Sequence, residues 1–455
     1  MDLSETKTCS TKDIESHPIL LQKGEVTPLP KTQLAIILFA RMAEPIAYAQ
    51  VLPYLNAMIE ETRIAPPDQV GFFSGLIESV AALLQLCTLV YWGSLSDRVG
   101  RKPVLLTGLL SISVATICFG QSNKLWQMVL FRGLNAALCG NSPIIGSIMS
   151  DIADKTNQHK VFPLAALTWY GGEMIGSLIG GLLSHPAEKY PGLFGFALLR
   201  ARPFLLPCLA SSLITCVAIV ATATLLKESH PHFREEETPR GPYLSAPREL
   251  KSYAGCQNGD LNGPSPATNA KGGQTLRLLS NATIRYILVA RFLRELLSTG
   301  FGQVLVLWSY TPLSMGGLQR SPAEIGTMLS FSGVLGAFTT TIVFHYFYRR
   351  SNSVTLFAAC MAIWGLAFAS VPVVSLTIRR ILPIPRTYDN APSMGGLWGL
   401  ILLVLAFQRL AEISYPASLL MANEAVSDPS SGGALFGLVT TAACLAEGIA
   451  PAITS

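Results

Sequence analysis

The chain has 455 residues, of which 50% are hydrophobic and 13% are charged, and its formal net charge is +5. Soluble domains carry roughly a quarter charged residues, so this composition excludes an ordinary soluble protein and predicts one that has lipid as its solvent. The positive charge lies mostly in short stretches between apolar segments, which argues against a face that binds nucleic acid.

The N-terminal residues 1–32 are polar and lack the apolar core and cleavage site of a secretory signal peptide, so they are predicted to form a disordered cytoplasmic tail. A helix that crosses a bilayer needs about 20 mostly apolar residues. Eleven such spans follow: Gln33–Ile59, Val70–Tyr91, Val104–Gly120, Trp126–Met149, Phe162–Leu183, Phe204–Leu226, Ile284–Tyr310, Ile325–Tyr346, Val354–Val374, Leu397–Leu420 and Ala434–Ile453. The sequence therefore predicts an all-α membrane protein.

The spans fall into two groups. Residues 33–226 hold six spans and predict an N-terminal six-helix bundle, whereas residues 284–455 hold five and predict a C-terminal bundle. Residues 227–283 between them are rich in Pro, Gly, Ser and Asn, so we expect a mostly disordered cytoplasmic loop. Lys and Arg residues near the span ends favour a cytoplasmic N-terminus, although Arg379, Arg380 and Arg386 oppose it.

A charged motif joins the second and third spans. Residues 93–102 read GSLSDRVGRK, and the candidate gating residues in it are Gly93, Asp97, Arg98, Gly100, Arg101 and Lys102. The stretch matches the pattern G-x-x-x-D-R-x-G-R-[RK] of major facilitator superfamily transporters in full and stands at the same place, so the chain resembles that family. The resemblance implies a cytoplasmic charge cluster that latches the inner helix ends in one state and releases them in another.

Two weaker motifs support the resemblance. Residues 172–181 read GEMIGSLIGG, which is similar to the antiporter motif G-x-x-x-G-P-x-x-G-G with Ser177 in place of proline; its glycines, Gly172, Gly176, Gly180 and Gly181, predict close helix packing. Residues 132–136 read RGLNA and resemble the family pattern R-x-x-Q-G, in which the arginine is tied to proton coupling. Arg132 is therefore a candidate coupling residue.

Residues of the first span indicate a particular branch of this family. The span reads RMAEPI over residues 41–46 and is followed by Pro53 and Tyr54, which is similar to the fungal and plant zinc-induced facilitator-like proteins within the drug:proton antiporter branch. The resemblance implies two bundles of six helices, so the five spans detected in the second half predict a C-terminal bundle without its twelfth span. A truncated gene model, a short isoform and a natural remnant remain open.

Ionisable residues inside spans are expensive in lipid and are functional candidates by default. Arg41 and Glu44 lie within one helical turn, as do Arg291 with Glu295 and Arg409 with Glu412, so each couple is a candidate neutralised pair. Glu78 and Glu173 have no partner in their own span. The candidates for proton coupling or substrate contact are Arg41, Glu44, Glu78, Arg132, Glu173, Glu295, Arg409 and Glu412.

No catalytic triad, nucleotide-binding loop or metal-ligand spacing is recognisable, so we expect no enzyme, cofactor or bound metal. We hypothesise secondary transport of a small organic molecule, with proton-coupled export by alternating access favoured. A nutrient uniporter or symporter, or a non-transporting sensor or truncated remnant, remains open. The expected partners are substrate, protons and the lipid bilayer, with a monomer in the plasma or vacuolar membrane and no nucleic acid.

Overall fold

A computed structural model describes residues 30–152, 158–228, 279–381, 394–425 and 432–454. All the regular secondary structure in these ranges is helical. The helices that carry the fold are α1 Lys31–Ala49, α2 Leu55–Glu61, α3 Val70–Val99, α4 Arg101–Gly120, α5 Leu125–Leu138, α6 Asn141–Ile152, α7 Gln158–Leu183, α11 Leu205–Leu225, α14 Ala282–Tyr310, α15 Pro322–Phe338, α16 Phe344–Tyr348, α17 Ser353–Ile381, α18 Met394–Ala411, α19 Ser414–Glu424 and α20 Gly432–Thr454. The predicted all-α fold is confirmed. Most of the N-tail, residues 1–29, and of the central loop, residues 229–278, lies outside the described ranges.

Within the described residues, seven helices are long and apolar enough to cross a membrane. Their outer faces keep large apolar side chains exposed, as on α11, where Leu213 is 67% and Val220 is 62% exposed. Water would penalise such a surface, whereas lipid tails match it. By contrast, α14 carries Arg285, Arg291, Arg294 and Glu295, which lowers its mean hydropathy although it has 29 residues.

Four of the predicted spans are interrupted in the structure. The first breaks after α1, where a turn containing Pro53 leads into α2, and the fourth breaks between α5 and α6. A Cβ atom at Gly140 in that second break would overlap the Trp92 side chain, so only glycine allows the approach. The eighth contains a π-helical turn, Thr339–Val343, between α15 and α16, and the tenth turns between α18 and α19. Interruptions of this kind often mark functional sites in membrane helices.

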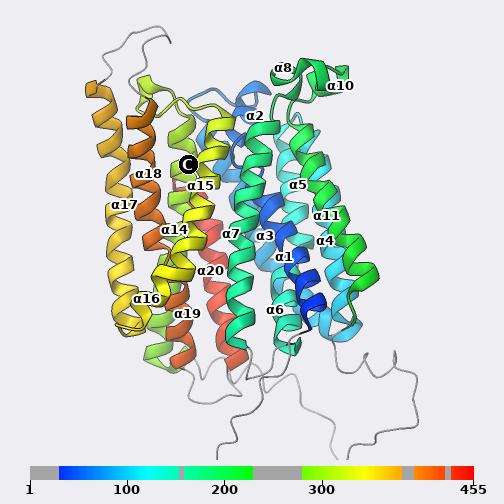
Figure 1. The fold of residues 1–455 in the computed structure, drawn as a ribbon, viewed down its shortest axis with the longest axis vertical. Coiled ribbons are helices and arrows are strands. Elements are labelled where there is room, and N and C mark those ends of the chain that lie inside the picture. Colours follow the sequence, from blue (N-terminus) through cyan, green and yellow to red (C-terminus); the bar gives the residue numbers. More distant parts are fainter. Residues whose placement is uncertain (1–29, 153–157, 229–278, 382–393, 426–431, 455) are drawn as a thin grey trace, which may run out of the picture.

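The helices stand side by side and form two groups, with α1 to α11 on one side and α14 to α20 on the other (Figure 1). The groups meet along two helix pairs, because α7 packs on α15 and α3 packs on α20. Each group has its own apolar core, with Ile37, Leu105 and Leu109 in the first and Phe301, Trp364 and Leu405 in the second. The contact between the groups therefore uses only a few helices.

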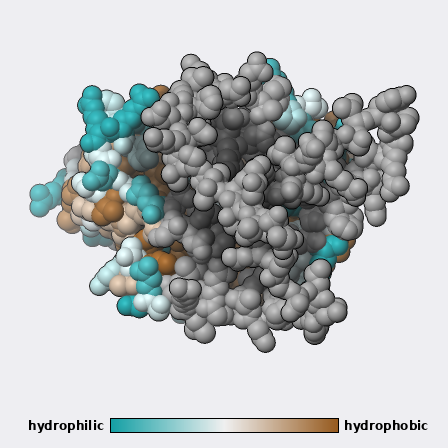
Figure 2. Space-filling view, turned by 90° about the horizontal axis from the view of Figure 1, so that it is seen from below, coloured by the Kyte–Doolittle hydropathy of each residue, from teal (hydrophilic) through white to brown (hydrophobic). Residues whose placement is uncertain are grey.

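The two ends of the bundle differ. The short helices α8 Pro186–Lys189, α9 Pro191–Phe194 and α10 Ala197–Ala201 lie at the end that is uppermost in Figure 1, whereas α1 begins at the lower end. Seen from below, hydrophilic residues gather around hydrophobic ones on the side that holds α17 (Figure 2). Arg349 and Arg350, which follow α16, are exposed. Polar residues thus mark the ends of the helices and apolar residues their lipid-facing flanks.

Candidate functional site

Charged side chains lie inside both helix groups. The first group contributes Arg41 and Glu44 from α1, Glu78 from α3, Arg132 from α5 and Glu173 from α7; the second contributes Arg291, Arg294 and Glu295 from α14, Arg409 from α18, Glu412 from the turn after α18 and Glu447 from α20. Burying a charge away from water costs several kcal/mol unless another charge or hydrogen bonds compensate it. The contacts of each side chain therefore show how its buried charge is compensated.

Arg132 and Glu78 form a two-pronged ion pair within the first group. The Nε of Arg132 donates to one carboxylate oxygen of Glu78 at 3.0 Å, and its second nitrogen donates to the other oxygen at 3.1 Å. Both side chains are 7% exposed. The guanidinium also lies 5.0 Å from the ring centre of Tyr48 on α1. The parallel geometry is the strongest that arginine and a carboxylate can adopt.

Arg41 and Glu44 form the pair expected from their spacing on α1. Their closest nitrogen and oxygen atoms are 3.4 Å apart, and both side chains are 16% exposed. The Arg41 guanidinium lies 5.8 Å from the ring centre of Trp169. This pair is longer and more exposed than that of Arg132 and Glu78, so it is held less tightly.

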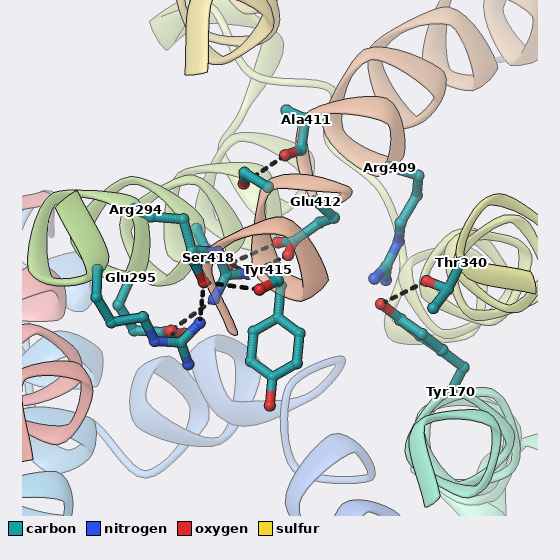
Figure 3. A network of polar contacts seen from close by, with 12 residues as sticks. Tyr170, Arg294, Glu295, Thr340, Arg409, Ala411, Glu412, Tyr415 and Ser418 are labelled. Atoms are coloured by element: carbon teal, nitrogen blue, oxygen red, sulfur yellow. Dashed lines mark hydrogen bonds and ion pairs between the residues drawn. The ribbon is translucent and has the colours of Figure 1, made fainter. Parts of the chain in front are cut away.

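The second group contains a connected network around Arg294 (Figure 3). Arg294 forms ion pairs with Glu295 on its own helix and with Glu412 from the turn that follows α18. The Ser298 hydroxyl donates to the other oxygen of Glu412. Arg291 pairs with Glu295 at 3.1 Å, as its spacing predicts, and donates to the Ser418 hydroxyl at 3.2 Å. The network ties α14 to the break between α18 and α19.

Among the residues that the structure describes, one ion pair joins the two groups. Arg409 on α18 pairs with Glu173 on α7, and its Nε donates to the Ser332 hydroxyl on α15 at 2.7 Å. The Arg409 guanidinium also lies 5.5 Å from the ring centre of Tyr170, whose hydroxyl accepts from Thr340 in the π-helical turn at 3.2 Å. Glu173 thus obtains its partner from a helix 236 residues away in the chain.

The structure corrects the interpretation of Arg409 and Glu412 as a pair within one helical turn. Among the described residues, Arg409 pairs with Glu173 and Glu412 pairs with Arg294. The reason is that α18 ends at Ala411, and the turn before α19 directs Glu412 toward α14, away from the side of α18 that bears Arg409 (Figure 3).

A further polar contact joins the groups at the upper end. The Tyr310 hydroxyl at the end of α14 donates to the Glu60 carboxylate on α2. Tyr310 also packs against the apolar cluster that contains Tyr54 and Met58, while Leu52 packs against the core of the second group. These contacts close the two groups together at the end opposite to the start of α1 (Figure 1).

The four glycines of the α7 motif lie on close helix crossings. A Cβ at Gly172 would meet the ring of Pro45 at 2.5 Å, one at Gly176 would meet the Ile46 carbonyl oxygen at 2.5 Å, and one at Gly180 would overlap the Gln50 carbonyl oxygen. These three glycines face α1. Gly181 faces the other group instead, where a Cβ would lie 2.7 Å from the Pro322 carbonyl oxygen of α15. One motif therefore serves two crossings.

The loop motif, residues 93–102, joins α3 to α4 at the lower end. Gly100 has φ 104°, which only glycine adopts without strain, and it is the residue before the first turn of α4. The backbone N–H groups of Arg101 and Lys102, in the first turn of α4, donate to the Glu228 carboxylate at 3.1 Å and 3.0 Å. Glu228 follows α11, so it fastens the start of α4 to the end of the first group. The side chain of Asp97 lies outside the described part.

Replacing Glu228 with glutamine should weaken this cap, because an amide lacks the negative charge that favours a helix N-terminus. We expect a loss of about 0.5–2 kcal/mol. Hydrogen–deuterium exchange at the amides of Arg101 and Lys102 measures it, and faster exchange there is the expected result. Glu188, which is exposed on α8, serves as the control position: Glu188→Gln should leave those amides unchanged. Equal exchange in wild type and Glu228→Gln would contradict the capping role.

The comparison with known sequences decides the family. The profile of the Major Facilitator Superfamily matches residues 36–451 of the chain. The chain belongs to the major facilitator superfamily. It is therefore a multi-pass integral membrane transporter of small molecules, and the predicted resemblance to this superfamily and to zinc-induced facilitator proteins is confirmed.

Relatives of the chain include proteins of fungi and of a plant. The major facilitator-type transporter psiT2 of Psilocybe cyanescens is 29% identical over 94% of this chain and 84% of its own length. The major facilitator superfamily multidrug transporter mfsB of Aspergillus fumigatus is 24% identical over 95% and 79%. Protein ZINC INDUCED FACILITATOR 1 of Arabidopsis thaliana is 26% identical over 93% and 83%.

The fold of the chain is similar to that of solved major facilitators. A bacterial homolog of the human lysosomal transporter Spinster, in an inward-facing and unoccupied conformation, superimposes with a TM-score of 0.63 at 15% identity and covers 94% of this chain and 82% of its own. Among the described residues of the present chain, no group of three or more His, Cys, Asp or Glu side chains is placed to hold a metal ion.

Several residues of the site were absent from the sequence-based candidates. Ser298 and Ser332 bind the central charges, Glu60 and Tyr310 close the upper end, and Glu228 caps α4. Serines in spans are common and the partners of Glu60 and Glu228 are more than 100 residues distant, so no local pattern identifies them. Glu447 was recognisable as a charge inside a span, in a stretch that resembles the family's eleventh-span pattern, but it was not among the site candidates.

Proposed function

We propose that this major facilitator is a proton-coupled exporter of a small organic molecule that works by alternating access. The observation that supports this most directly is the ion pair of Arg409 and Glu173 between the two helix groups. Residues 33–226 and 284–455 would move as two bodies, with the substrate cavity between them. Any opening along α7 and α15 would have to separate these two charges.

Separating a buried pair leaves two uncompensated charges, which costs about 3–5 kcal/mol. A proton on Glu173 removes one of the charges, so Arg409 loses its ion-pair partner and keeps its hydrogen bond to Ser332 and its contact with the ring of Tyr170. The pair of Arg132 and Glu78 lies within one group and need not break during this motion. In this scheme Glu173 and Arg409 couple the proton to opening, while Glu78, Arg132, Arg41, Glu44, Glu295 and Glu412 organise the cavity.

Export is favoured by the α7 glycine motif, which is similar to the antiporter motif, and by relatives that include a multidrug transporter and the efflux pump azaK of Aspergillus niger. The test is transport in proteoliposomes with an imposed proton gradient. Efflux that rises with the gradient and stops when an ionophore collapses it is the expected result. Transport that is unaffected by collapse would refute coupling.

Glu173→Gln should uncouple the transporter. The amide mimics the protonated carboxyl, so gradient-driven transport should fall by about tenfold or more, given the cost of one lost charge partner. The exchange Glu173→Arg with Arg409→Glu should recover part of the activity, since it restores an ion pair across the groups. Glu188→Gln on α8 is the control. Wild-type coupling in Glu173→Gln would remove this residue from the mechanism.

A uniporter or symporter for uptake is the second candidate. Ser177 replaces the proline of the antiporter motif, and α7 runs without a kink-forming proline from Gly172 to Leu183. The direction of net flux in vesicles of known orientation separates uptake from export. A non-transporting sensor predicts no flux of any substrate in the same vesicles.

We also propose a monomer with a cytoplasmic N-terminus in the plasma or vacuolar membrane. The loop motif and Glu228 would then lie on the cytoplasmic side, and Glu60 and Tyr310 would close the opposite side. A cysteine introduced at Arg98, which is exposed in the last turn of α3, tests the orientation through its accessibility to a membrane-impermeant reagent in intact cells. Labelling without permeabilisation would reverse it.

A further inference from the structure

The charges inside the two helix groups do not balance. Away from the ends of the predicted spans there are five arginines, Arg41, Arg132, Arg291, Arg294 and Arg409, and six glutamates, Glu44, Glu78, Glu173, Glu295, Glu412 and Glu447. Five ion pairs use all the arginines and five of the glutamates. Glu447 on α20 is the remaining carboxylate, and within the described part of the chain it forms no ion pair or hydrogen bond.

The surroundings of Glu447 do not supply a free positive charge. The charged groups that act on it are Glu295, Arg291 and Arg294 from α14 and Glu44 from α1. Both arginines already bind Glu295, and Arg294 also binds Glu412. The guanidinium groups of Arg291 and Arg294 also lie 4.5 Å and 5.0 Å from the ring centre of Tyr415 on α19. From α3, Leu83 packs beside Gly448, the next residue of α20.

Glu447 also lies at the junction of the two groups. It belongs to α20, which packs on α14 in its own group and on α3 in the other. Its electrostatic influence reaches Tyr48 and Glu44 on α1. A carboxylate in this position would be exposed to the central cavity that alternating access requires.

We propose that Glu447 is the site at which the transporter takes up one positive charge, borne by a proton in the empty protein and by the ammonium group of an organic cation in the loaded protein. The inference rests on the proposed proton-coupled transport and adds the substrate class. A single unpaired carboxylate in a low-dielectric region is stabilised by one cation. Because proton and ammonium need the same oxygens, binding of one excludes the other, as exchange requires.

An anionic substrate fits this arrangement less well. Every arginine in the region is already paired with a carboxylate, so an anion would have to displace a glutamate from an existing ion pair. Breaking such a pair costs about 3–5 kcal/mol, whereas a cation at Glu447 breaks none.

Infrared spectroscopy of the full chain in lipid nanodiscs tests the proton. A protonated carboxyl has a C=O stretching band that a carboxylate lacks. We expect this band at neutral pH in the wild type and its loss in Glu447→Gln. Cys444→Ala, one turn away on α20, is the matched control and should keep the band. Because lipid esters absorb in the same region, the band is read from the difference between spectra of the wild type and each variant in the same lipid. A difference spectrum in which Glu447→Gln loses no more of the band than Cys444→Ala does would refute the assignment.

Benzyltrimethylammonium, which carries no dissociable proton, tests the cation, with benzyl alcohol as the neutral comparison. The cation should diminish the band, release about one proton per chain into unbuffered solution, and bind with an apparent Kd that rises about tenfold per pH unit on acidification. Benzyl alcohol should do none of this. A band that neither this cation nor a series of aromatic amines diminishes would overturn the substrate class.

The vesicle experiment keeps the two proposals apart. Suppose that a neutral or anionic compound is transported by the gradient and that cations do not affect the Glu447 band. This result overturns the inference about Glu447 and leaves proton coupling intact. Competition between proton and cation at Glu447, together with transport that ignores the proton gradient, supports the site and overturns the coupled mechanism.

Discussion

Glu78→Leu is expected to lower the thermal stability of the purified protein strongly, by about 3–5 kcal/mol. The substitution leaves the Arg132 guanidinium buried without the two carboxylate oxygens that bind it at 3.0 and 3.1 Å. The nearby Tyr48 ring supplies only a weaker attraction. Thermal unfolding followed by intrinsic fluorescence in detergent measures the effect.

The double variant Glu78→Leu with Arg132→Leu separates charge from packing. Replacing both members of a buried pair by apolar residues is often neutral or stabilising, so the double variant should recover most of the loss. The less buried pair of α1 is the comparison: Glu44→Leu should cost clearly less, since that pair is 3.4 Å long and 16% exposed. Equal losses in the single and double variants would show that packing, and not the unpaired charge, carries the effect.

Gly180→Ala should disrupt the packing of α7 on the end of α1. A Cβ there would overlap the carbonyl oxygen of Gln50, which is backbone and cannot rotate away as a side chain can. Overpacking of this kind costs about 1–3 kcal/mol, and a forced shift of α1 would also move Arg41 and Glu44. Thermal unfolding of the purified variant measures the loss.

Gly171→Ala on the same helix is the matched control. A Cβ at Gly171 would lie 3.7 Å from the end of the Met42 side chain, an ordinary contact. Since alanine favours a helix over glycine by up to about 1 kcal/mol, this variant should be as stable as the wild type or more so. If both alanine variants behaved alike, helix propensity and not close packing would explain the motif.

Several features of this protein follow from local sequence. A run of apolar residues long enough to cross lipid must become a helix, because lipid offers no partner for the backbone, so the helical class and most spans were predictable. Pairs on one continuous helix were predictable too, since residues three or four apart share a face: Arg41 lies beside Glu44 and Arg291 beside Glu295. The full motif at residues 93–102 was sufficient to indicate the superfamily.

The breaks within spans were not predictable to the same degree. The turn between α18 and α19 precedes Pro416, which has no N–H to bond to the Glu412 carbonyl and whose ring would clash with that carbonyl in a continuous helix. A break near Glu412 was therefore readable from the sequence, but the transfer of Glu412 from Arg409 to Arg294 was not. Hydropathy predicts the length of a span but not whether its helix is continuous. A helix can break inside the membrane because the backbone groups freed at the break can bond to the protein that surrounds them.

The sequence by itself thus determined that this chain is a helical membrane transporter and which charges lie within its spans. Only the tertiary structure decided how those charges are divided: Glu78 with Arg132, Glu173 with Arg409 across the two groups, and Glu447 with none among the described residues. The physical reason is the separation along the chain over which each property is decided. Helix formation in lipid depends on neighbours within a few residues, whereas the partner of a buried charge depends on which helices pack together, over separations of 54 residues for the first pair and 236 for the second.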